Sequence, residues 1–222
     1  GERCMAISVA VPVGEETADR LIEKLAPRIE KLKVGPYTAG DDVDFGPVVT
    51  SAAKQNILNL VQSGIDQGAE LVIDGRDFSL QGYENGFFVG PHLFDRVTPD
   101  MDIYKKEIFG PVLSTVRAGS YEEAIGLAMS HEYGNGTAIF TRDGDTARDF
   151  ANRINIGMVG VNVPIPVPLA YHTFGGWKKS VFGDLNQHGP DAFKFYTRTK
   201  TVTSRWPSGI KEGGEFNFKA MD

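Results

Sequence analysis

The sequence predicts an α/β fold, a parallel sheet with helices packed on both faces in three αβα layers. Between residues 111 and 162, short apolar runs alternate with helical patterns in the order strand, helix, strand, helix, strand. Such alternation is typical of parallel strands joined by crossover helices. The 222 residues are 41% hydrophobic and 23% charged, an ordinary composition for a chain with one sizeable core. Functional groups are expected at the C-terminal ends of the strands, where open parallel sheets bind their ligands.

Two helices are predicted in the first third of the chain. Over residues 15–33 apolar side chains recur every three or four positions, which indicates a helix with one buried face. Pro27 should kink or divide this helix near Ala26, because proline lacks the backbone donor and crowds the preceding turn. A second helix is predicted over residues 50–68, with a hydroxyl side chain as its cap and a glycine at its end.

The middle of the chain predicts strands. Residues 71–73 and 111–116 are short apolar runs, with extended structure predicted over residues 87–97 between them. A turn or short helix should then place Glu107 and Phe109 at the head of the strand at 111–116.

Two more helices and two more strands should complete the sheet. Ser120 and Glu123 have the spacing of a capping box at the start of one helix. Apolar residues between positions 147 and 154 define the inner face of the other. The strands are predicted at residues 137–141 and 157–162, so that each helix is followed by a strand.

The pattern changes near the C-terminus. Residues 171–180 form a loop rich in aromatic residues and glycine. In residues 194–206 threonines alternate with basic residues and valine, which predicts a strand with little to bury on either face. Such a strand would be an exposed edge, and a solvated tail is the alternative interpretation. Residues 207–222 are polar and contain glycine, which predicts a flexible tail.

Charge and cysteine content exclude several classes of function. A net charge of −6 argues against a nucleic-acid partner or an anionic membrane. The most apolar run, residues 158–170, contains three prolines and cannot span a bilayer as a helix. The single cysteine excludes an internal disulfide and indicates a reducing location, either the cytoplasm or, alternatively, the mitochondrial matrix. The histidines lack the spacing of metal ligands, so no metal site is predicted.

Cys4 is the candidate nucleophile. Its thiolate would be favoured by the guanidinium of Arg3, or by the N-terminus of a helix over residues 5–11. On local sequence alone, a buried apolar thiol is the more common alternative for a cysteine among Met, Ala and Ile.

Three separated motifs resemble one known family. Residues 1–6, Gly-Glu-Arg-Cys-Met-Ala, resemble the active-site segment of the aldehyde dehydrogenase superfamily, and residues 106–112 resemble its Glu-Ile-Phe-Gly-Pro cofactor segment. The two lie 107 − 4 = 103 positions apart, in the order expected of that family. The arginine before the cysteine, the proline-rich residues 160–168 and the ending at 200–206 resemble the methylmalonate-semialdehyde dehydrogenases, the CoA-acylating branch.

The resemblance implies roles for individual residues. It implies that Cys4 attacks an aldehyde and that Arg3 grips the carboxylate of a semialdehyde substrate, although an ion pair with Glu2 is the alternative role for Arg3. It implies that Glu107 binds the ribose hydroxyls of NAD and that Phe109 packs beside the nicotinamide. Without the resemblance, these two would be read as a solvated turn residue and a core residue.

Two further side chains are candidates for the substrate pocket. Phe174 belongs to the aromatic loop, which is similar to a Pro-Phe-Gly-Gly loop of the family but has Thr173 in place of the proline and Val181 in place of a later glycine. These departures leave the path of the loop open. Asn162 follows a predicted strand and is the second candidate, although asparagine there is more often a turn former.

The resemblance also implies substrates and domains. The products would be acetyl-CoA or propionyl-CoA and carbon dioxide, with NAD and coenzyme A consumed. A hydrolytic NAD(P)-dependent dehydrogenase and a non-catalytic assembly fragment are the alternatives. Residues 1–193 would be the catalytic domain, and residues 194–206 a strand that crosses to another subunit of a homodimer or homotetramer. The NAD-binding domain is expected outside this chain, as the N-terminal part of a longer protein, so the chain by itself is expected to be inactive.

Overall fold

The computed structural model describes residues 1–206 of the chain. Its main sheet has four strands in the spatial order β1-β4-β3-β2. These strands are β1 (Val9–Ala10), β2 (Glu70–Ile73), β3 (His92–Asp95) and β4 (Val112–Thr115). β1 runs parallel to β4, and β4 runs parallel to β3, which confirms the predicted α/β class with a parallel sheet.

β2 departs from the parallel order, because it pairs with β3 in the antiparallel direction. The chain between these two strands, residues 74–91, contains turns but no helix. A parallel pair needs a crossover connection, usually a helix, whereas a chain that only turns back makes an antiparallel pair. The strand itself lies where the sequence predicts it, and the connection without a crossover helix goes with its antiparallel direction.

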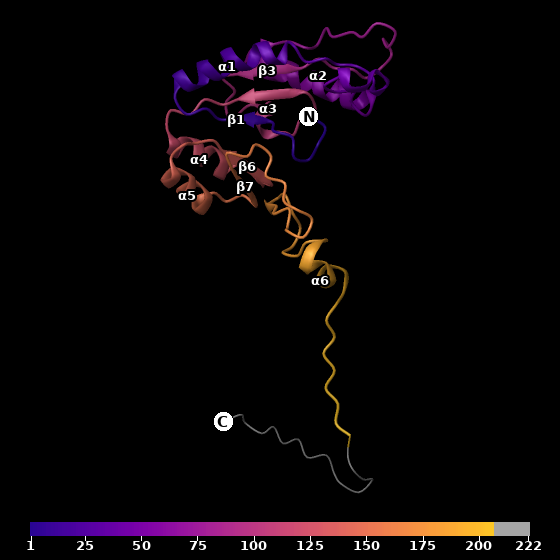
Figure 1. The fold of residues 1–222 in the computed structure, drawn as a ribbon, viewed down its shortest axis with the longest axis vertical. Helices are drawn as coiled ribbons and strands as arrows, with labels where there is room; N and C mark the ends of the chain where they lie inside the picture. The colour runs from indigo at the N-terminus through magenta and orange to yellow at the C-terminus, as the bar shows by residue number, and fades with distance from the viewer. Residues whose placement is uncertain (207–222) are drawn as a thin grey trace.

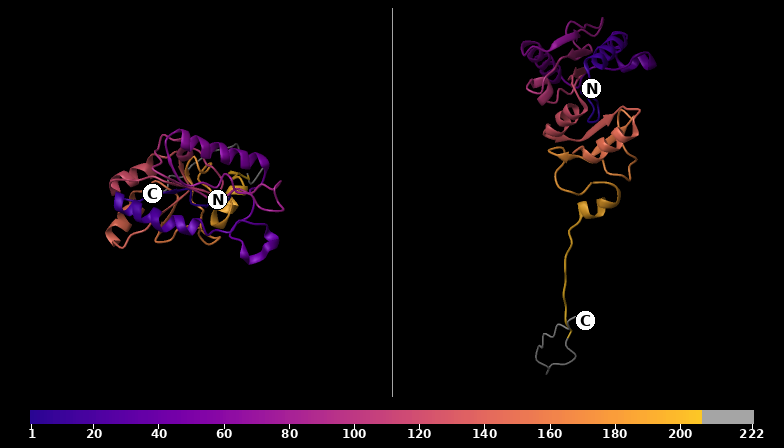
Figure 2. Two further views of the ribbon diagram at one scale, coloured as in Figure 1. Left: turned by 90° about the horizontal axis from the view of Figure 1, so that it is seen from above. Right: turned by 90° about the vertical axis from the view of Figure 1, so that its left-hand side faces the viewer.

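Two long helices cover the main sheet. α1 (Glu15–Ile29) and α2 (Ser51–Asp66) lie on opposite sides of the strands, as Figure 2 shows in its left view. α2 begins where Thr50 Oγ1 accepts a hydrogen bond from the N–H of Ala53 at 3.0 Å. Its buried residues Ile57 and Val61 pack in one core cluster with strand residues such as Phe94.

Pro27 does not divide α1. The helix continues to Ile29, so the prediction of a division near Ala26 was wrong. Pro27 lies in the last turn, where its missing N–H removes one bond, and the N–H of Glu30 still donates to the carbonyl of Ala26 at 3.0 Å.

The second half of the described chain forms smaller sheets of its own. β6 (Gly136–Ile139) pairs in parallel with β7 (Met158–Val161), while β5 (Tyr133–Gly134) pairs antiparallel with β8 (Trp177–Lys178). These two sheets are not hydrogen-bonded to the main sheet. The sequence therefore predicts the strands of β6 and β7 correctly but not their separation from β4.

Two helices belong to this smaller part, α4 (Tyr121–Ser130) and α5 (Gly144–Arg153). They and their neighbouring strands enclose a second core cluster, whose fully buried members are Ile125, Phe150, Ile154 and Ile156. The predicted cap of α4 is present, because Ser120 Oγ accepts from the N–H of Glu123 at 3.2 Å. The Glu123 carboxylate reaches the N–H of Gly119 rather than that of Ser120.

The C-terminal part leaves the body of the molecule. After a short helix, α6 (Ala192–Tyr196), the chain runs away from the other elements without secondary structure up to residue 206 (Figure 1). The prediction of a strand from residue 194 was wrong for residues 194–196, which are helical. For residues 197–206 no ladder forms within the described chain, since a strand exists only against a partner. The flexible tail predicted at 207–222 lies outside the described residues.

No helix among residues 1–206 combines the length and the apolar character that a membrane crossing requires.

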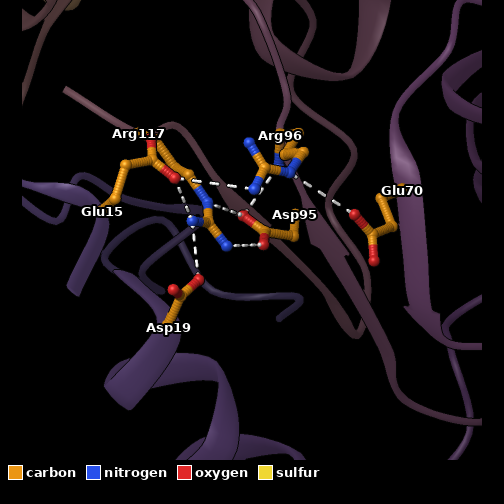
Figure 3. Close-up of polar contacts among 6 residues, drawn as sticks. All are labelled: Glu15, Asp19, Glu70, Asp95, Arg96 and Arg117. Carbon is orange, nitrogen blue, oxygen red and sulfur yellow. Dashed lines mark hydrogen bonds and ion pairs between the residues drawn. The ribbon is translucent and has the colours of Figure 1, made fainter. Parts of the chain in front are cut away.

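The C-terminal ends of β3 and β4 carry a network of ion pairs (Figure 3). Its six members are Glu15, Asp19, Glu70, Asp95, Arg96 and Arg117. The largely buried guanidinium of Arg117, whose side chain is 11% exposed, lies at the centre and binds Asp95 at 2.5 Å, Glu15 at 2.6 Å and Asp19 at 2.8 Å. The network therefore ties the start of α1 to the ends of two strands.

Burial alone would raise the pKa of the Asp95 carboxyl, because a carboxylate is costly to remove from water. Hydrogen bonds from Arg117 and from the N–H of Arg96 outweigh this effect, and the pKa of Asp95 lies below its usual range. The carboxylate is thus ionised and fully used in an internal pair. This edge of the sheet is occupied by structural charges.

Candidate active site

Cys4 stands in an exposed β-turn. The N–H of Ala6 donates to the carbonyl of Arg3 at 3.0 Å, so Cys4 and Met5 are the two central residues of this turn. The thiol of Cys4 is free and exposed. It is therefore not the buried apolar cysteine that local sequence favours, and its sulfur is accessible to a reactant.

The helix expected over residues 5–11 does not form, so it cannot supply an N-terminus to Cys4. The backbone after the turn is extended instead, and it enters the main sheet as β1. There the carbonyl of Ser8 accepts from the N–H of Ser114 at 3.0 Å, and the carbonyl of Ala10 accepts from the N–H of Val116 at 2.9 Å. Pairing with β4 thus overrides any local helical preference. Arg3 remains as the cation next to the thiol.

Arg3 shares a small hollow with Glu107 and Phe109. The hollow is about 10 Å³, which is the volume of roughly one water-sized sphere. It is therefore a point of contact between two segments and not a formed pocket for a dinucleotide. The ion pair considered between Arg3 and Glu2 is absent from residues 1–206, since the Glu2 carboxylate accepts from the N–H of Val49 at 3.1 Å.

The two motif segments are held together by close backbone contact. A Cβ atom on Gly1 would lie 1.9 Å from the carbonyl oxygen of Gly110. On its other side Gly110 is pressed against Ile57 of α2, at 2.5 Å from a Cβ built on it. Only glycine fits at such distances, so the packing requires glycine at both positions.

The segment before β4 presents its side chains alternately inward and outward. It follows α3 (Asp102–Lys105), the short helix that the sequence predicts. Ile108 is buried in the core, whereas Phe109 is 42% exposed and has a left-handed backbone with φ of 55°. An aromatic residue rarely adopts this conformation, and such strain is concentrated at functional sites. The alternative role of Phe109 as a core residue is not what the structure shows.

Glu107 is exposed, and within residues 1–206 no hydrogen bond or ion pair engages its carboxylate. A carboxylate is a double hydrogen-bond acceptor, which suits a pair of ribose hydroxyls. The exposed ring of Phe109 beside it offers an apolar face to a planar ring. These two residues fit the nicotinamide end of NAD. No group of three His, Cys, Asp or Glu side chains in the described part of the chain can hold a metal ion.

The aromatic loop follows a path that its glycines allow. Gly175 and Gly176 both have positive φ, 63° and 79°, and a Cβ on Gly157 would lie 2.1 Å from the nitrogen of Gly176. The loop thus passes directly over Gly157, which precedes β7. Phe174 at this crossing packs on the ring of His188, with ring centres 4.5 Å apart.

Lys178 and Ser180 anchor this loop, and sequence reasoning assigned neither of them a role. Lys178 Nζ donates to the carbonyls of Ala128, Met129 and His131 at the end of α4, at 3.3, 2.8 and 3.0 Å. Burial lowers the pKa of this ammonium. Ser180 Oγ accepts from the N–H of Gly134 at 3.0 Å. A lysine near a helix C-terminus can cap the helix. The sequence gives no sign of this cap here, because Lys178 lies about 50 positions after the end of α4.

Asn135 is the other residue that the sequence did not single out. Its side-chain amide donates to the carbonyl of Cys4 at 3.4 Å and to Met5 Sδ at 3.3 Å. The sequence feature that could have pointed to Asn135 is a polar residue between two glycines at the start of a strand. By itself this feature indicates only a turn.

Asn162 lies at the far end of the small sheet. Its amide exchanges two hydrogen bonds with the backbone of Thr141, both 3.0 Å long, and it has positive φ. Thr141 is six residues beyond Asn135, so about 20 Å of strand separates it from the Cys4 contact. The structure thus gives Asn162 a turn-forming role at the edge away from Cys4.

Four of the candidate residues, Arg3, Cys4, Glu107 and Phe109, lie before the N-terminal ends of β1 and β4. Cys4 precedes β1 by 9 − 4 = 5 residues, and Glu107 precedes β4 by 112 − 107 = 5 residues. Because β1 and β4 are parallel, both motifs emerge at the same edge. These four lie at the edge opposite to the expected one, and the C-terminal ends of β3 and β4 hold the Arg117 network. Asn162 is the candidate that does follow the C-terminal end of a parallel strand, β7.

Comparison with known proteins gives consistent results. A family model described as "Aldehyde dehydrogenase family" matches residues 1–202. Malonate-semialdehyde dehydrogenase of Pseudomonas aeruginosa is 59% identical over 222 residues, which are 100% of this chain and 44% of that protein. Mitochondrial methylmalonate-semialdehyde dehydrogenase [acylating] of Arabidopsis thaliana is 50% identical over 208 residues, which are 93% of this chain and 33% of that protein.

Solved structures agree with these relatives. A Sinorhizobium meliloti protein that carries the name methylmalonate-semialdehyde dehydrogenase, complexed with NAD, is 75% identical, with a TM-score of 0.88 over 95% of this chain and 43% of that one. Methylmalonate-semialdehyde dehydrogenase of Oceanimonas doudoroffii is 55% identical, with a TM-score of 0.87 over 94% of this chain and 42% of that one. The chain spans less than half the length of the proteins that it matches.

Proposed function

Since the chain belongs to the aldehyde dehydrogenase family, we propose that it is the catalytic portion of a NAD-dependent, CoA-acylating dehydrogenase of malonate or methylmalonate semialdehyde. One observation carries the proposal: the exposed thiol of Cys4 stands in a turn beside Arg3, and Arg3 lines a small hollow together with Glu107 and Phe109. The names of the relatives from Pseudomonas and Arabidopsis support this substrate class.

In the first step the Cys4 thiolate adds to the aldehyde carbon and forms a hemithioacetal alkoxide. The carbonyl π electrons move to oxygen, and the backbone N–H of Cys4 is available to donate to the negative charge. The guanidinium of Arg3 binds the carboxylate at the other end of the substrate with two parallel hydrogen bonds. A three-carbon semialdehyde is short, which suits two adjacent residues holding its two ends.

Glu107 and Phe109 would hold the cofactor at its nicotinamide end. NAD+ would supply the hydride acceptor when bound, so that the alkoxide on Cys4 could collapse to a thioester. The role of the protein here is orientation, through the exposed carboxylate of Glu107 and the ring of Phe109.

The acyl group leaves by transfer to a second thiol. The thiol of coenzyme A attacks the thioester carbonyl, the bond to Cys4 Sγ breaks, and Cys4 returns as a thiolate while the incoming thiol loses its proton. The substrate carboxylate departs as carbon dioxide, its electron pair passing to the α-carbon, which takes up a proton. The products are acetyl-CoA from malonate semialdehyde and propionyl-CoA from methylmalonate semialdehyde.

The decisive experiment measures NADH formation from malonate semialdehyde by the full-length protein, with and without coenzyme A. We expect sustained turnover only when coenzyme A is present, and no NADH from the Cys4→Ala variant. Turnover with water alone would identify a hydrolytic dehydrogenase instead. Continued acyl-enzyme formation by Cys4→Ala would refute the assigned nucleophile. The 222-residue chain by itself should be inactive, because the adenosine side of NAD needs a further binding domain.

A homo-oligomer is proposed on a separate observation. The segment 197–206 leaves the body of the molecule (Figure 1). Val202 is 75% exposed and Trp206 is 89% exposed. Large exposed apolar side chains on an extended segment favour pairing with another subunit. Removal of residues 197–222 should therefore reduce the mass measured by sedimentation to that of a monomer. An unchanged mass would refute this role.

A reducing location, cytoplasm or mitochondrial matrix, is proposed from the single cysteine and from the mitochondrial name of the Arabidopsis relative.

A further inference from the structure

The turn that presents Cys4 has a peptide group that its own hydrogen bond does not fix. The bond from the N–H of Ala6 to the carbonyl of Arg3 closes the turn, but the central peptide between Cys4 and Met5 takes no part in it. In β-turns this central peptide has two orientations, which distinguish types I and II and differ in the sign of φ at the third residue. Met5 is not among the residues of positive φ, so the turn adopts the first orientation.

Asn135 supplies the contact that selects this orientation. The nitrogen of its side-chain amide donates to two atoms of the turn, the carbonyl oxygen of Cys4 at 3.4 Å and Met5 Sδ at 3.3 Å. The carbonyl of Cys4 is the group that would reverse direction if the central peptide rotated. One contact is therefore on the central peptide itself, and the other is on the side chain of the residue that follows it.

The backbone of Asn135 is itself held firmly. Its carbonyl accepts from the N–H of Met158 at 3.0 Å, and the carbonyl of Gly134 accepts from the N–H of Gly157 at 3.0 Å. The next residue, Gly136, begins β6, and a Cβ there would lie 3.0 Å from the terminal methyl of Met5. The nucleophile turn thus rests on the first residues of the small sheet, and a rigid element carries the amide.

We propose that Asn135 is a positioning residue for Cys4: its amide fixes the peptide that follows the cysteine and thereby sets the reactivity of the thiol. A carbonyl and a sulfur on one Cα are close enough for the carbonyl dipole to act on the charge of the thiolate. A hydrogen bond from the Asn135 amide directs the negative oxygen of this carbonyl toward Asn135 and away from the sulfur. This inference rests on the proposed function, because it presupposes that Cys4 is the nucleophile.

The test uses the full-length protein and the variants Asn135→Leu and Asn135→Asp. Leucine removes both donors at similar size, and aspartate keeps the shape but places a negative charge where the donors were. Asn59→Leu is the matched control, since Asn59 lies exposed on α2 and bonds only to the side chain of Gln55 among the described residues. The readouts are the pH dependence of iodoacetamide labelling at Cys4, followed by mass spectrometry, the rate of the first NADH turnover, and the thermal midpoint.

Asn135→Leu should slow the first turnover by about tenfold, with a change in KM below about twofold, because the loss acts on the nucleophile and not on substrate binding. Asn135→Asp should move the labelling midpoint upward by about one pH unit, since a neighbouring carboxylate disfavours the thiolate. Asn59→Leu should match the wild type. A residue that only stabilised the fold would lower the thermal midpoint and leave the labelling midpoint in place.

Labelling midpoints and first-turnover rates equal to wild type in both Asn135 variants would overturn the inference. The Cys4→Ala variant separates this outcome from failure of the proposed function. If Cys4→Ala still forms NADH, the nucleophile is wrong. If it is silent while the Asn135 variants behave as wild type, the nucleophile is right and Asn135 does not position it.

Discussion

The guanidinium of Arg117 binds the buried carboxylate of Asp95 at 2.5 Å and closes the C-terminal edge of the main sheet (Figure 3). The side chains are only 11% and 4% exposed, so neither charge is compensated by bulk water. Breaking such a pair leaves a buried charge without a partner.

Arg117→Met should therefore destabilise the protein by about 3–5 kcal/mol in the free energy of unfolding, measured by urea denaturation. Arg153→Met is the matched control. Arg153 also binds two carboxylates, Glu122 and Asp149, but its side chain is 40% exposed. Its loss should cost less than about 1 kcal/mol. Equal losses in the two variants would contradict the role of burial.

The same pair predicts a pH dependence of stability. The pKa of Asp95 is lower in the folded state than in the unfolded chain, so this carboxylate contributes stability at pH values above its unfolded pKa of about 3.9. The contribution is lost as the pH falls through the lower, folded pKa. Urea midpoints measured between about pH 3 and pH 7 should therefore fall less steeply for Asp95→Asn than for the wild type. Parallel curves would show that Asp95 does not titrate as described.

Lys178→Met should lower stability by about 2 kcal/mol, because three carbonyls at the end of α4 lose a charged donor. It should also raise the KM for the semialdehyde, since Lys178 anchors the loop that carries Phe174. The neighbouring Lys179→Met removes an exposed ion pair with Glu132 and should change stability by less than about 1 kcal/mol. An unchanged KM in Lys178→Met would separate the loop anchor from the substrate site.

Gly157→Ala should destabilise the protein by about 3 kcal/mol or more, because the new Cβ would meet backbone atoms of Gly175 and Gly176 that have no room to move. Gly126→Ala is the opposite case. Gly126 lies in α4 with no atom within 4 Å of a built Cβ, so alanine there should stabilise the helix by about 0.5–1 kcal/mol. Thermal unfolding of both variants measures the contrast, and a stable Gly157→Ala would contradict the close crossing.

Arg3→Leu should reduce kcat/KM for malonate semialdehyde by about 10- to 100-fold, the range expected when a bidentate charged contact is lost. Propanal has the aldehyde but no carboxylate, so its kcat/KM should change by less than about threefold. Steady-state rates with the two substrates provide the measurement. Equal losses of kcat/KM with the two substrates would show that Arg3 acts on the thiol of Cys4 and does not bind the substrate carboxylate.

Helices were predictable where local signals agree. Thr50 and Ser120 cap α2 and α4 as their sequence spacing indicates, and the apolar face of α2 is the face that packs on the sheet. These features depend on residues at most about four positions apart. The effect of Pro27 was not predictable from local signals, because it depends on whether the proline falls inside the helix or in its last turn.

Pairing between distant segments was not predictable in the same way. The direction of β2, the separation of the small sheets and the contact of Asn135 with Cys4 depend on hydrogen bonds between residues far apart in sequence. Asn162 illustrates the consequence. An asparagine side chain suits a substrate site. The side chain of Asn162, however, makes both of its hydrogen bonds to the backbone of Thr141, at the end of the strand away from Cys4. Residues 197–206 predict a strand, but no strand among residues 1–206 pairs with them.

The sequence by itself identified the candidate residues: Cys4 with Arg3 from the reactivity of a thiol beside a cation, and Glu107 with Phe109 only through the resemblance of their segment to a known family. Only the tertiary structure decided where these residues meet. β1 and β4 run side by side in the same direction, and this pairing brings two segments 103 positions apart to one N-terminal edge. The opposite edge is taken by Arg117 and its carboxylates, since buried charges must be paired where the strands end.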